Sequence, residues 1–222
     1  MRHLLSSTLV LALLVGGMLI PLPAEAVPIT ITNPSFEDPA TSTIISAITG
    51  WTIFGSGAGV WNINDYSQGF WTVPAPDGKQ IAYVSPAPSG AAAISQIVGT
   101  LQATTTYTLS GYVGDPINNS ATFTAALLAG GNLLAYVSGI PSQGLFDSFQ
   151  VVFDSTGSLY VGKPLEIQLY SNQNQTGFDA ISLDAASLDA ASLGAAVPEP
   201  ATLLLLGSGL AGLAAWRKWR PV

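Results

Sequence analysis

The segment Thr106-Tyr107-Thr108-Leu109-Ser110-Gly111-Tyr112-Val113 decides the class of fold, because large apolar residues alternate in it with small polar ones. Successive side chains of a β-strand point to opposite faces of the sheet, so Tyr107, Leu109 and Val113 would share one face. A helix would instead repeat its apolar residues every three to four positions. The segment therefore predicts a strand with one buried face and one exposed face, as in antiparallel sheets.

Short segments of similar character fill residues 27–183, and clusters of Pro, Gly, Asn and Asp separate them. These clusters are typical of turns, and no stretch in this range has a convincing helical period. The sequence therefore predicts an all-β passenger domain, a two-sheet antiparallel β-sandwich of the jelly-roll type. The expected strands lie near residues 29–32, 44–54, 60–63, 80–84, 94–98, 105–113, 122–128, 133–137, 149–153, 165–170 and 178–183.

Residues 1–26 have the order of a secretory signal peptide. Arg2 precedes an apolar run over residues 9–20, and Ala24-Glu25-Ala26 is a cleavage site of the A-x-A kind. We expect the secretion translocon to export the chain and cleavage after Ala26 to leave Val27 as the first residue. This segment is therefore excluded from the fold.

The other end of the chain, residues 197–222, has the order of a membrane tail. Val197-Pro198-Glu199-Pro200 precedes an uncharged run over residues 201–216, and Arg217, Lys218 and Arg220 follow it. A helix over about residues 201–216 would rise only about 24 Å, which is short of a hydrocarbon core of roughly 30 Å. The cationic cluster predicts that the chain stops with its basic end in the cytoplasm. The sequence thus predicts a single, marginal transmembrane helix that suits temporary anchoring.

This tail resembles the PEP-CTERM sorting signal of Gram-negative bacteria that secrete exopolysaccharide, a segment also labelled the ice-binding protein C-terminal domain. The resemblance implies that an exosortase-type membrane protease removes the tail near Pro198-Glu199-Pro200. It also implies an exported protein that is held in the inner membrane and then released to the cell surface or the extracellular matrix. Before the tail, residues 184–196 repeat Ser-Leu-Asp-Ala-Ala, a period that fits neither strand nor helix, and we expect a spacer whose first copy finishes the last strand.

Composition excludes several kinds of chemistry and one class of partner. The chain has no cysteine and one histidine, His3, which lies in the predicted signal peptide. A mature chain without either residue type has no Ser-His-Asp or Cys-His nucleophile, no disulfide and no thiolate or imidazole zinc site. The formal net charge of −7 makes nucleic acid an unsuitable partner. Carboxylate chemistry, oxygen-ligated metals or no catalysis remain.

Two motifs resemble the opening and closing signatures of galactose-binding-like jelly rolls, which include many carbohydrate-binding modules. They are Asn33-Pro34-Ser35-Phe36-Glu37 and Gly177-Phe178-Asp179-Ala180-Ile181-Ser182-Leu183. The resemblance implies that Glu37 and Asp179 meet at a structural calcium ion, which accepts six to eight oxygen ligands in flexible geometry. The alternative is that Glu37 caps a turn and Asp179 accepts hydrogen bonds from backbone amides.

Aromatic residues cluster between Trp51 and Trp71, with amides and carboxylates among them. Trp51 follows a glycine at a strand start and is predicted to lie in the core. Trp61, Tyr66 and Trp71 lie in or beside a polar, loop-like stretch and are predicted to be exposed. Aromatic faces stack on sugars while polar groups bind the hydroxyls, so these three are candidates for glycan binding. Packing under a long loop is the alternative.

No catalytic residue stands out. A glycosidase needs two carboxylates flanking a cleft, but Glu37 and Asp38 would point to opposite faces of a strand, and Glu166 lies in another expected strand. The sequence therefore predicts a protein that is not an enzyme. The expected function is an adhesive module that binds extracellular polysaccharide; the alternative is an inert structural surface-coat protein without a small ligand.

Overall fold

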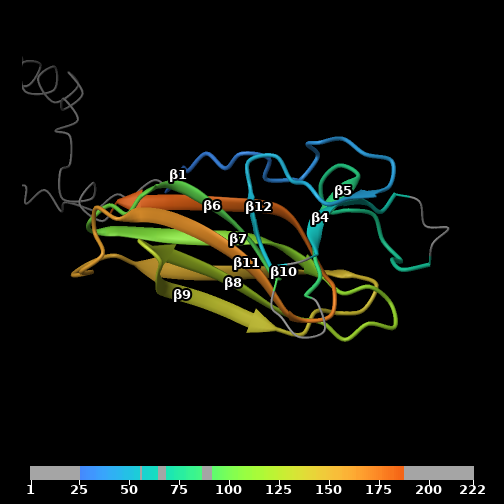
Figure 1. The fold of residues 1–222 in the computed structure, drawn as a ribbon. Helices are drawn as coiled ribbons and strands as arrows, with labels where there is room; N and C mark the ends of the chain where they lie inside the picture. Colours follow the sequence, from blue (N-terminus) through green and yellow to red (C-terminus); the bar gives the residue numbers. More distant parts are fainter. Residues whose placement is uncertain (1–25, 56, 65–68, 87–91, 188–222) are drawn as a thin grey trace, which may run out of the picture. The chain divides into compact units, whose positions relative to one another are not determined.

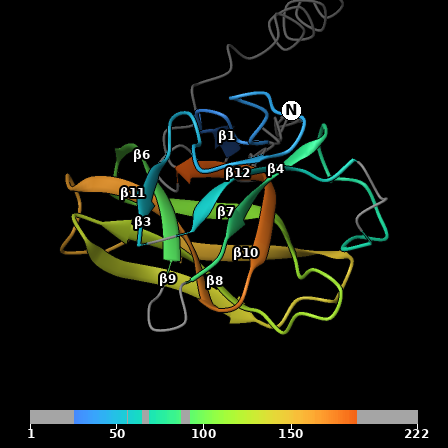
Figure 2. The ribbon, with the colours of Figure 1, turned by 45° about the vertical axis from the view of Figure 1, so that its right-hand side comes forward.

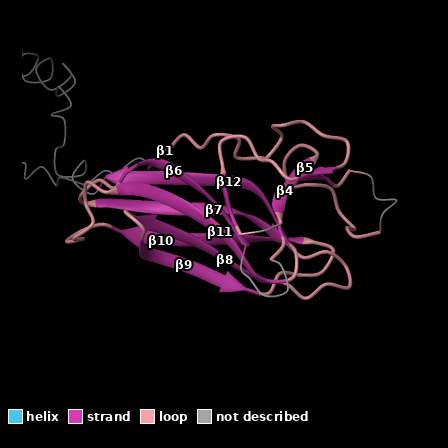
Figure 3. Cartoon of the chain, in the orientation of Figure 1, coloured by secondary structure: helices cyan, strands magenta, loops and turns pink. Residues whose placement is uncertain are grey.

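The computed structural model describes residues 26–55, 57–64, 69–86 and 92–187. The regular elements of these residues are all strands, arranged in two antiparallel sheets that pack as a sandwich (Figures 1 and 3). The predicted all-β two-sheet sandwich is thus confirmed. Among the described residues, no helix is long and apolar enough to cross a membrane. The predicted signal peptide up to residue 25, the sorting motif and the helix near residues 201–216 lie outside the described residues.

The larger sheet has seven strands. Its order is β10 (Phe146–Asp154), β7 (Thr105–Gly114), β12 (Thr176–Ser187), β5 (Gln80–Val84), β4 (Ala58–Asn62) and β2 (Ile44–Ile45), with β1 (Ala26–Pro28) paired to β12.

The smaller sheet has five strands, visible side by side in Figure 2. Its order is β3 (Thr52–Phe54), β6 (Ala92–Thr100), β11 (Pro164–Gln173), β8 (Thr122–Ala129) and β9 (Asn132–Gly139). Most strands that follow one another along the chain therefore lie in different sheets.

The main core lies between the sheets. Tyr107, Leu109 and Val113 of β7 are buried there, as the alternation predicts, while Tyr112 is exposed. Trp51 is also buried as predicted; its ring centre is 5.3 Å from that of Phe36, and its indole N–H donates to the carbonyl of Thr32. Each fully buried Leu or Phe contributes roughly 1.5–3 kcal/mol relative to exposure, so this layer is a major source of stability.

Two expected strands differ from the structure. Residues 44–54 form β2 in one sheet and β3 in the other, because Gly50 turns the chain with a φ of +81° that favours glycine. Residues 29–32 form no strand; Ile29 N–H donates to the Leu183 carbonyl, and Thr32 N–H donates to the Gln96 side chain. Contacts of this kind leave no periodic signal in the sequence.

The last strand extends into the repeat. β12 ends at Ser187, which pairs with Thr105, so the first repeat of the predicted spacer completes the sheet. The register of β12 against β7 shifts between Asp179 and Ser182, where Ala180 has a φ of +48°. This irregularity lies beside Asp179, one of the predicted site residues.

Candidate functional site

The outer face of the larger sheet carries a second, smaller hydrophobic cluster. Trp71 packs in it over two glycines, Gly114 of β7 and Gly177 of β12, which are direct partners across the strand pair. A Cβ atom at Gly114 would lie 2.6 Å from the Trp71 ring, and one at Gly177 would lie 3.1 Å from it. Only a glycine pair therefore leaves room for this tryptophan on the sheet.

Trp71 belongs to a row of four aromatic rings. Its ring is stacked on Phe146 with centres 4.6 Å apart, and it meets Trp61 edge-on at 6.0 Å. Trp61 in turn meets Phe70 edge-on at 5.6 Å. Such pairs each contribute about 0.5–1.5 kcal/mol beyond burial, so the row is a rigid unit.

The predicted exposure of two sugar-binding candidates is wrong. Trp61 and Trp71 keep only 7% and 5% of their surface exposed. Trp61 belongs to β4 and Trp71 to the loop after it, and both are packed in the second cluster, which is close to the alternative stated for such aromatics. The buried indole N–H of Trp71 has no acceptor within the described part of the chain. Tyr66 lies outside the described residues.

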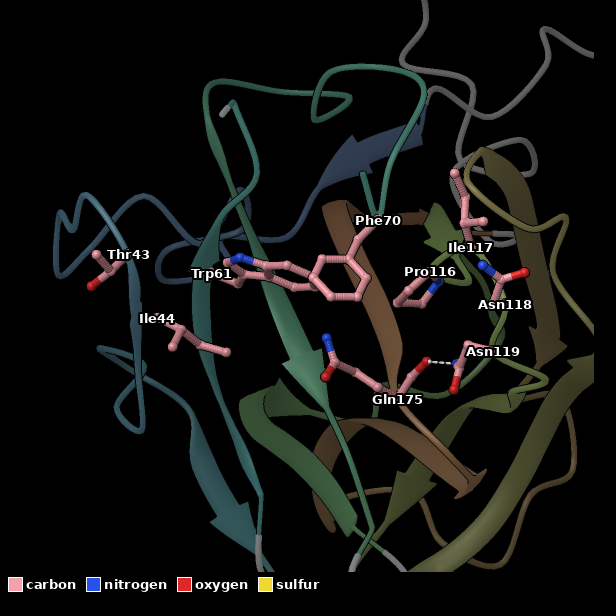
Figure 4. Close-up of a pocket in the computed structure, with 9 residues that line it drawn as sticks. All are labelled: Thr43, Ile44, Trp61, Phe70, Pro116, Ile117, Asn118, Asn119 and Gln175. Carbon is pink, nitrogen blue, oxygen red and sulfur yellow. Dashed lines mark hydrogen bonds between the residues drawn. The ribbon is translucent and has the colours of Figure 1, made fainter. Parts of the chain in front are cut away.

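Trp61 nevertheless lines a pocket of about 430 Å³ at one end of the row (Figure 4). Phe70 forms the wall beside it, and Figure 4 shows the Gln175 side chain extending beneath the two rings. Among the described residues, no side chain that lines the pocket titrates near neutral pH. The pocket is lined by Thr43, Ile44, Trp61, Phe70, Pro116, Ile117, Asn118, Asn119 and Gln175.

A buried carboxylate holds the amide side of the pocket in place. Asp115 accepts hydrogen bonds from the Asn119 side chain and from Ala121 N–H. The same Asn119 amide group donates to the Gln175 backbone carbonyl at 2.7 Å, the dashed line in Figure 4. Ile117 N–H donates to the Phe70 carbonyl at 2.9 Å, so the two walls are joined. The pocket is therefore largely pre-formed.

Gln175 differs from Asn119 in what its side chain contacts. Its backbone carbonyl is occupied, but no hydrogen bond joins its side-chain amide to another residue of the described part of the chain. A side-chain amide offers two N–H donors and a carbonyl acceptor, and none of these is bonded to another described residue here. The pocket thus presents a polar group under an aromatic wall.

A second hollow of about 440 Å³ lies at the other end of the aromatic row. It is bounded by Phe146 and by residues 73–76, and Tyr112 and Asp147 line it. The Asp147 carboxylate accepts a hydrogen bond from Ser142 N–H at 2.6 Å. This hollow lacks the convergence of amides that marks the Trp61–Phe70 pocket.

The predicted calcium ligands converge on one segment, residues 77–80. Glu37 Oε1 accepts hydrogen bonds from Lys79 N–H at 2.7 Å and from Gln80 N–H at 2.6 Å. Asp179 accepts from Asp77 N–H at 2.8 Å through Oδ2, and from Ala180 N–H through Oδ1. These are the backbone contacts that the alternative to calcium predicts.

Burial raises the pKa of Asp179 to about 8, and repulsion by the carboxylates of Asp77 and Glu37 adds to the shift, against the two backbone hydrogen bonds. Carboxylates are among the oxygen ligands that calcium prefers, so this group of repelling carboxylates has the right donor type. Within the described residues, however, no three acidic, histidine or cysteine side chains are placed to hold a metal together.

Comparison with known proteins identifies the family. The model of the HpiC1 cyclase family matches residues 27–184, which is most of the chain. The chain belongs to the HpiC1-like cyclase family. The PEP-CTERM protein-sorting motif matches residues 196–220, so the sequence-based prediction of an exported protein with this motif is confirmed. None of the curated proteins matches the chain.

Solved structures of cyclases agree with the family. The Stig cyclase Fisc from Fischerella sp. TAU, in complex with (3Z)-3-(1-methyl-2-pyrrolidinylidene)-3H-indole, is 26% identical with a TM-score of 0.66, over 73% of this chain and 99% of that one. A cyclase from the same organism, in complex with 4-(1H-indol-3-yl)butan-2-one, is 26% identical with a TM-score of 0.65. The match covers 73% of this chain and 98% of that one. A CBM22-1 xylan-binding domain from Paenibacillus barcinonensis is more distant, with 17% identity and a TM-score of 0.46. The match covers 74% of this chain and 97% of that one.

The prediction that the protein is not an enzyme is therefore wrong, since the family and these similar structures are cyclases. The error has a physical reason. Sequence reasoning searched for nucleophiles, metal ligands and paired carboxylates, whereas this pocket consists of aromatic rings and amides from distant segments. The pairing of Gly114 with Gly177 beneath Trp71 forms only in the fold.

Proposed function

We propose that the protein is an exported cyclase that binds a flat, nitrogen-bearing aromatic substrate of the indole type in the Trp61–Phe70 pocket and closes a ring on it. The observation that carries the proposal is the pocket's composition, two aromatic rings with three side-chain amides around them. Membership of the cyclase family supports the class of reaction. The indole compounds bound by similar cyclases support the class of substrate.

The pocket suits an indole for two reasons. An indole presents a broad ring that packs against Trp61 and Phe70, and such aromatic contacts are worth about 0.5–1.5 kcal/mol beyond burial. Its single N–H is a donor only and needs an acceptor. The side-chain carbonyl of Gln175, which lines the pocket, would accept that hydrogen. One face of the substrate would thus be fixed by the rings and one edge by the amide.

The walls would promote ring closure by orientation and by electrostatics. Bringing two reacting groups together costs entropy. When the pocket already holds them in contact, the barrier to reaction falls by an amount that can reach roughly 7–11 kcal/mol in well-oriented reactions. Aromatic faces also attract positive charge, by about 0.5–2 kcal/mol, so charge that builds up on an indole during ring closure is stabilised. The lining side chains in the described part of the chain are aromatic, aliphatic, hydroxyl and amide groups, so their role would be to bind and orient the substrate.

The test is a calorimetric titration of the full chain with 4-(1H-indol-3-yl)butan-2-one. We expect saturable binding that Phe70→Ala weakens by about tenfold, which corresponds to 1.4 kcal/mol. Phe54→Ala is the matched control, because Phe54 is as exposed as Phe70, at 47% against 45%, but lies on β3 of the other sheet. Absence of binding, or an equal loss in both variants, would contradict the proposal.

We also propose that calcium binds at Glu37 and Asp179, with backbone oxygens completing its shell, as the resemblance to galactose-binding-like jelly rolls implies. Mutual repulsion of these carboxylates supports it. A ligand that binds only the folded state at a hundredfold excess over its Kd stabilises that state by about 2.7 kcal/mol. Calcium should therefore raise the melting temperature over that in EGTA, and Glu37→Gln should remove the difference while Glu166→Gln keeps it. An unchanged melting temperature would sink the idea.

For the route of the protein, we propose that an exosortase-type protease removes the tail near Pro198-Glu199-Pro200 after export. The chain would then reach the surface or the exopolysaccharide matrix of a Gram-negative cell. The matched sorting motif supports this order of events. Mass spectrometry of the secreted form should show a C-terminus within or before residues 198–200; a form that keeps Arg220 would argue against removal.

A further inference from the structure

The outer face of the smaller sheet carries a shallow groove that the proposed cyclase site does not use. Its volume is about 430 Å³, and it lies across β11, β8 and β9, three neighbouring strands. The groove is lined by Thr124, Ala126, Leu128, Gly131, Leu133, Tyr136, Gln168 and Tyr170. None of these residues lines the Trp61–Phe70 pocket, so the two sites share no side chain.

The strand register sets the layout of this groove. Ala126 on β8 is the direct partner of Gln168 on β11 and of Tyr136 on β9. Tyr170 follows two residues after Gln168 and is the partner of Thr124. The two tyrosines thus lie on either side of β8, on strands about 10 Å apart, with small residues between them. They frame a shallow floor with an aromatic ring on each side.

The side chains of the groove stand outward because their neighbours are in the core. Leu165, Ile167 and Leu169 of β11 are fully buried between the sheets, which places Gln168 and Tyr170 on the other face. Tyr136 is 59% exposed. Tyr170 is half-buried, and neither tyrosine forms an aromatic pair with another described ring.

The chemistry of the lining selects its ligand. The polar groups are a hydroxyl and an amide, Thr124 and Gln168, with the phenols of the two tyrosines, and no lining side chain is charged at neutral pH. Tyrosine rings pack on the apolar faces of pyranoses, and neutral polar groups exchange hydrogen bonds with their hydroxyls. The net charge of −7 disfavours an anionic polymer.

We infer that this groove binds a neutral polysaccharide chain, which would hold the exported domain on extracellular glycan while the pocket on the other sheet stays free. The inference does not rest on the cyclase proposal. It also replaces Trp61 and Trp71, which are buried, with Tyr136 and Tyr170 as the glycan-contacting rings.

The experiment is affinity electrophoresis of the full chain through gels that contain xylan, galactan or hydroxyethylcellulose, with alginate as the anionic comparison. At least one neutral polymer should retard the protein, and alginate should not. Tyr136→Ala and Tyr170→Ala should each raise the Kd about tenfold. Tyr136→Phe should retain most of the binding, since it keeps the ring. Tyr112→Ala, which removes an exposed tyrosine of the larger sheet, is the control and should bind like the parent.

Three outcomes would overturn the inference: no neutral polymer retards the chain, alginate retards it more, or the two tyrosine variants bind like the parent. Thermal melts of each variant exclude unfolding as the cause of a loss. Titration of the same variants with 4-(1H-indol-3-yl)butan-2-one separates the two sites. Failure of glycan binding with intact indole binding would reject this groove alone.

Discussion

The outer faces of the two sheets differ in what covers them. On the larger sheet, Trp71 packs over the glycine pair of β7 and β12 and is almost fully buried. On the smaller sheet, Tyr136 and Tyr170 lie on either side of β8; Tyr136 is exposed and Tyr170 is half-buried. The glycines make space for a second hydrophobic cluster on one face, whereas the other face keeps ordinary side chains and a shallow groove. The difference shows that aromatic content alone does not locate a binding surface in a sandwich.

The largest expected effect is a difference between the two faces in how much the loss of an aromatic side chain lowers the free energy of unfolding. Trp71→Ala removes the centre of the aromatic row and should destabilise the fold by about 4 kcal/mol, in the range for truncating a buried Trp. Tyr136→Ala on the open face should cost less than about 1 kcal/mol. Urea unfolding midpoints of the two variants measure the contrast; equal shifts would mean that the covered face is not a packed core.

A smaller effect comes from the glycine pair. Gly114→Val would place atoms against the Trp71 ring and the Leu145 carbonyl, both 2.6 Å from a Cβ at this position. Overpacking of this kind costs about 1–3 kcal/mol. Ser138→Val introduces a valine at an exposed position of β9 and should change the free energy of unfolding little. The unfolding free energies of the pair decide whether the glycines are needed for packing.

The buried Asp179 should make stability depend on pH. Its pKa is about 8 in the fold against 3.8 for the free group, so between about pH 4 and pH 8 the unfolded chain loses a proton that the folded chain keeps. Stability should therefore fall as pH rises through this window, by at least about 1 kcal/mol, and then level off. Asp179→Asn should flatten the dependence in chelated buffer, and a slope identical to that of the parent would contradict the assignment.

The smallest expected effect concerns the free amide of the pocket. Gln175→Ala should weaken binding of 4-(1H-indol-3-yl)butan-2-one by about threefold to tenfold, because one hydrogen bond is worth about 0.5–1.5 kcal/mol net. Asn172→Ala alters another exposed amide near the same turn and should leave affinity unchanged. Calorimetry of both variants shows whether the amide contributes to recognition; a loss in Asn172→Ala alone would refute its role.

Local patterns predicted much of the fold. The alternation around Tyr107 and Leu109 correctly placed a strand with one buried face, and the glycine before Trp51 correctly placed that tryptophan in the core. Residues 44–54 were predicted as one strand because nothing local shows that β2 and β3 pair with different sheets. Short-range periodicity thus predicts strands but not their partners.

The candidate site was harder to predict for the same reason. Trp61 was singled out and does line the pocket, but its burial depends on contacts with Trp71 and Phe70. Asn119 and Gln175 carried no signal, since their pairing joins two turns that are distant in the sequence. Glu37 and Asp179 both accept hydrogen bonds from residues 77–80, and the sequence left open whether backbone amides or an ion hold them.

The most direct test of the central claim is a crystal structure of the chain with 4-(1H-indol-3-yl)butan-2-one bound. The account predicts density for the indole ring between Trp61, Phe70 and Gln175, with its N–H directed at the Gln175 side chain. Density in the hollow bounded by Phe146 and Tyr112 instead, or a pocket left unchanged at saturating ligand, would contradict it.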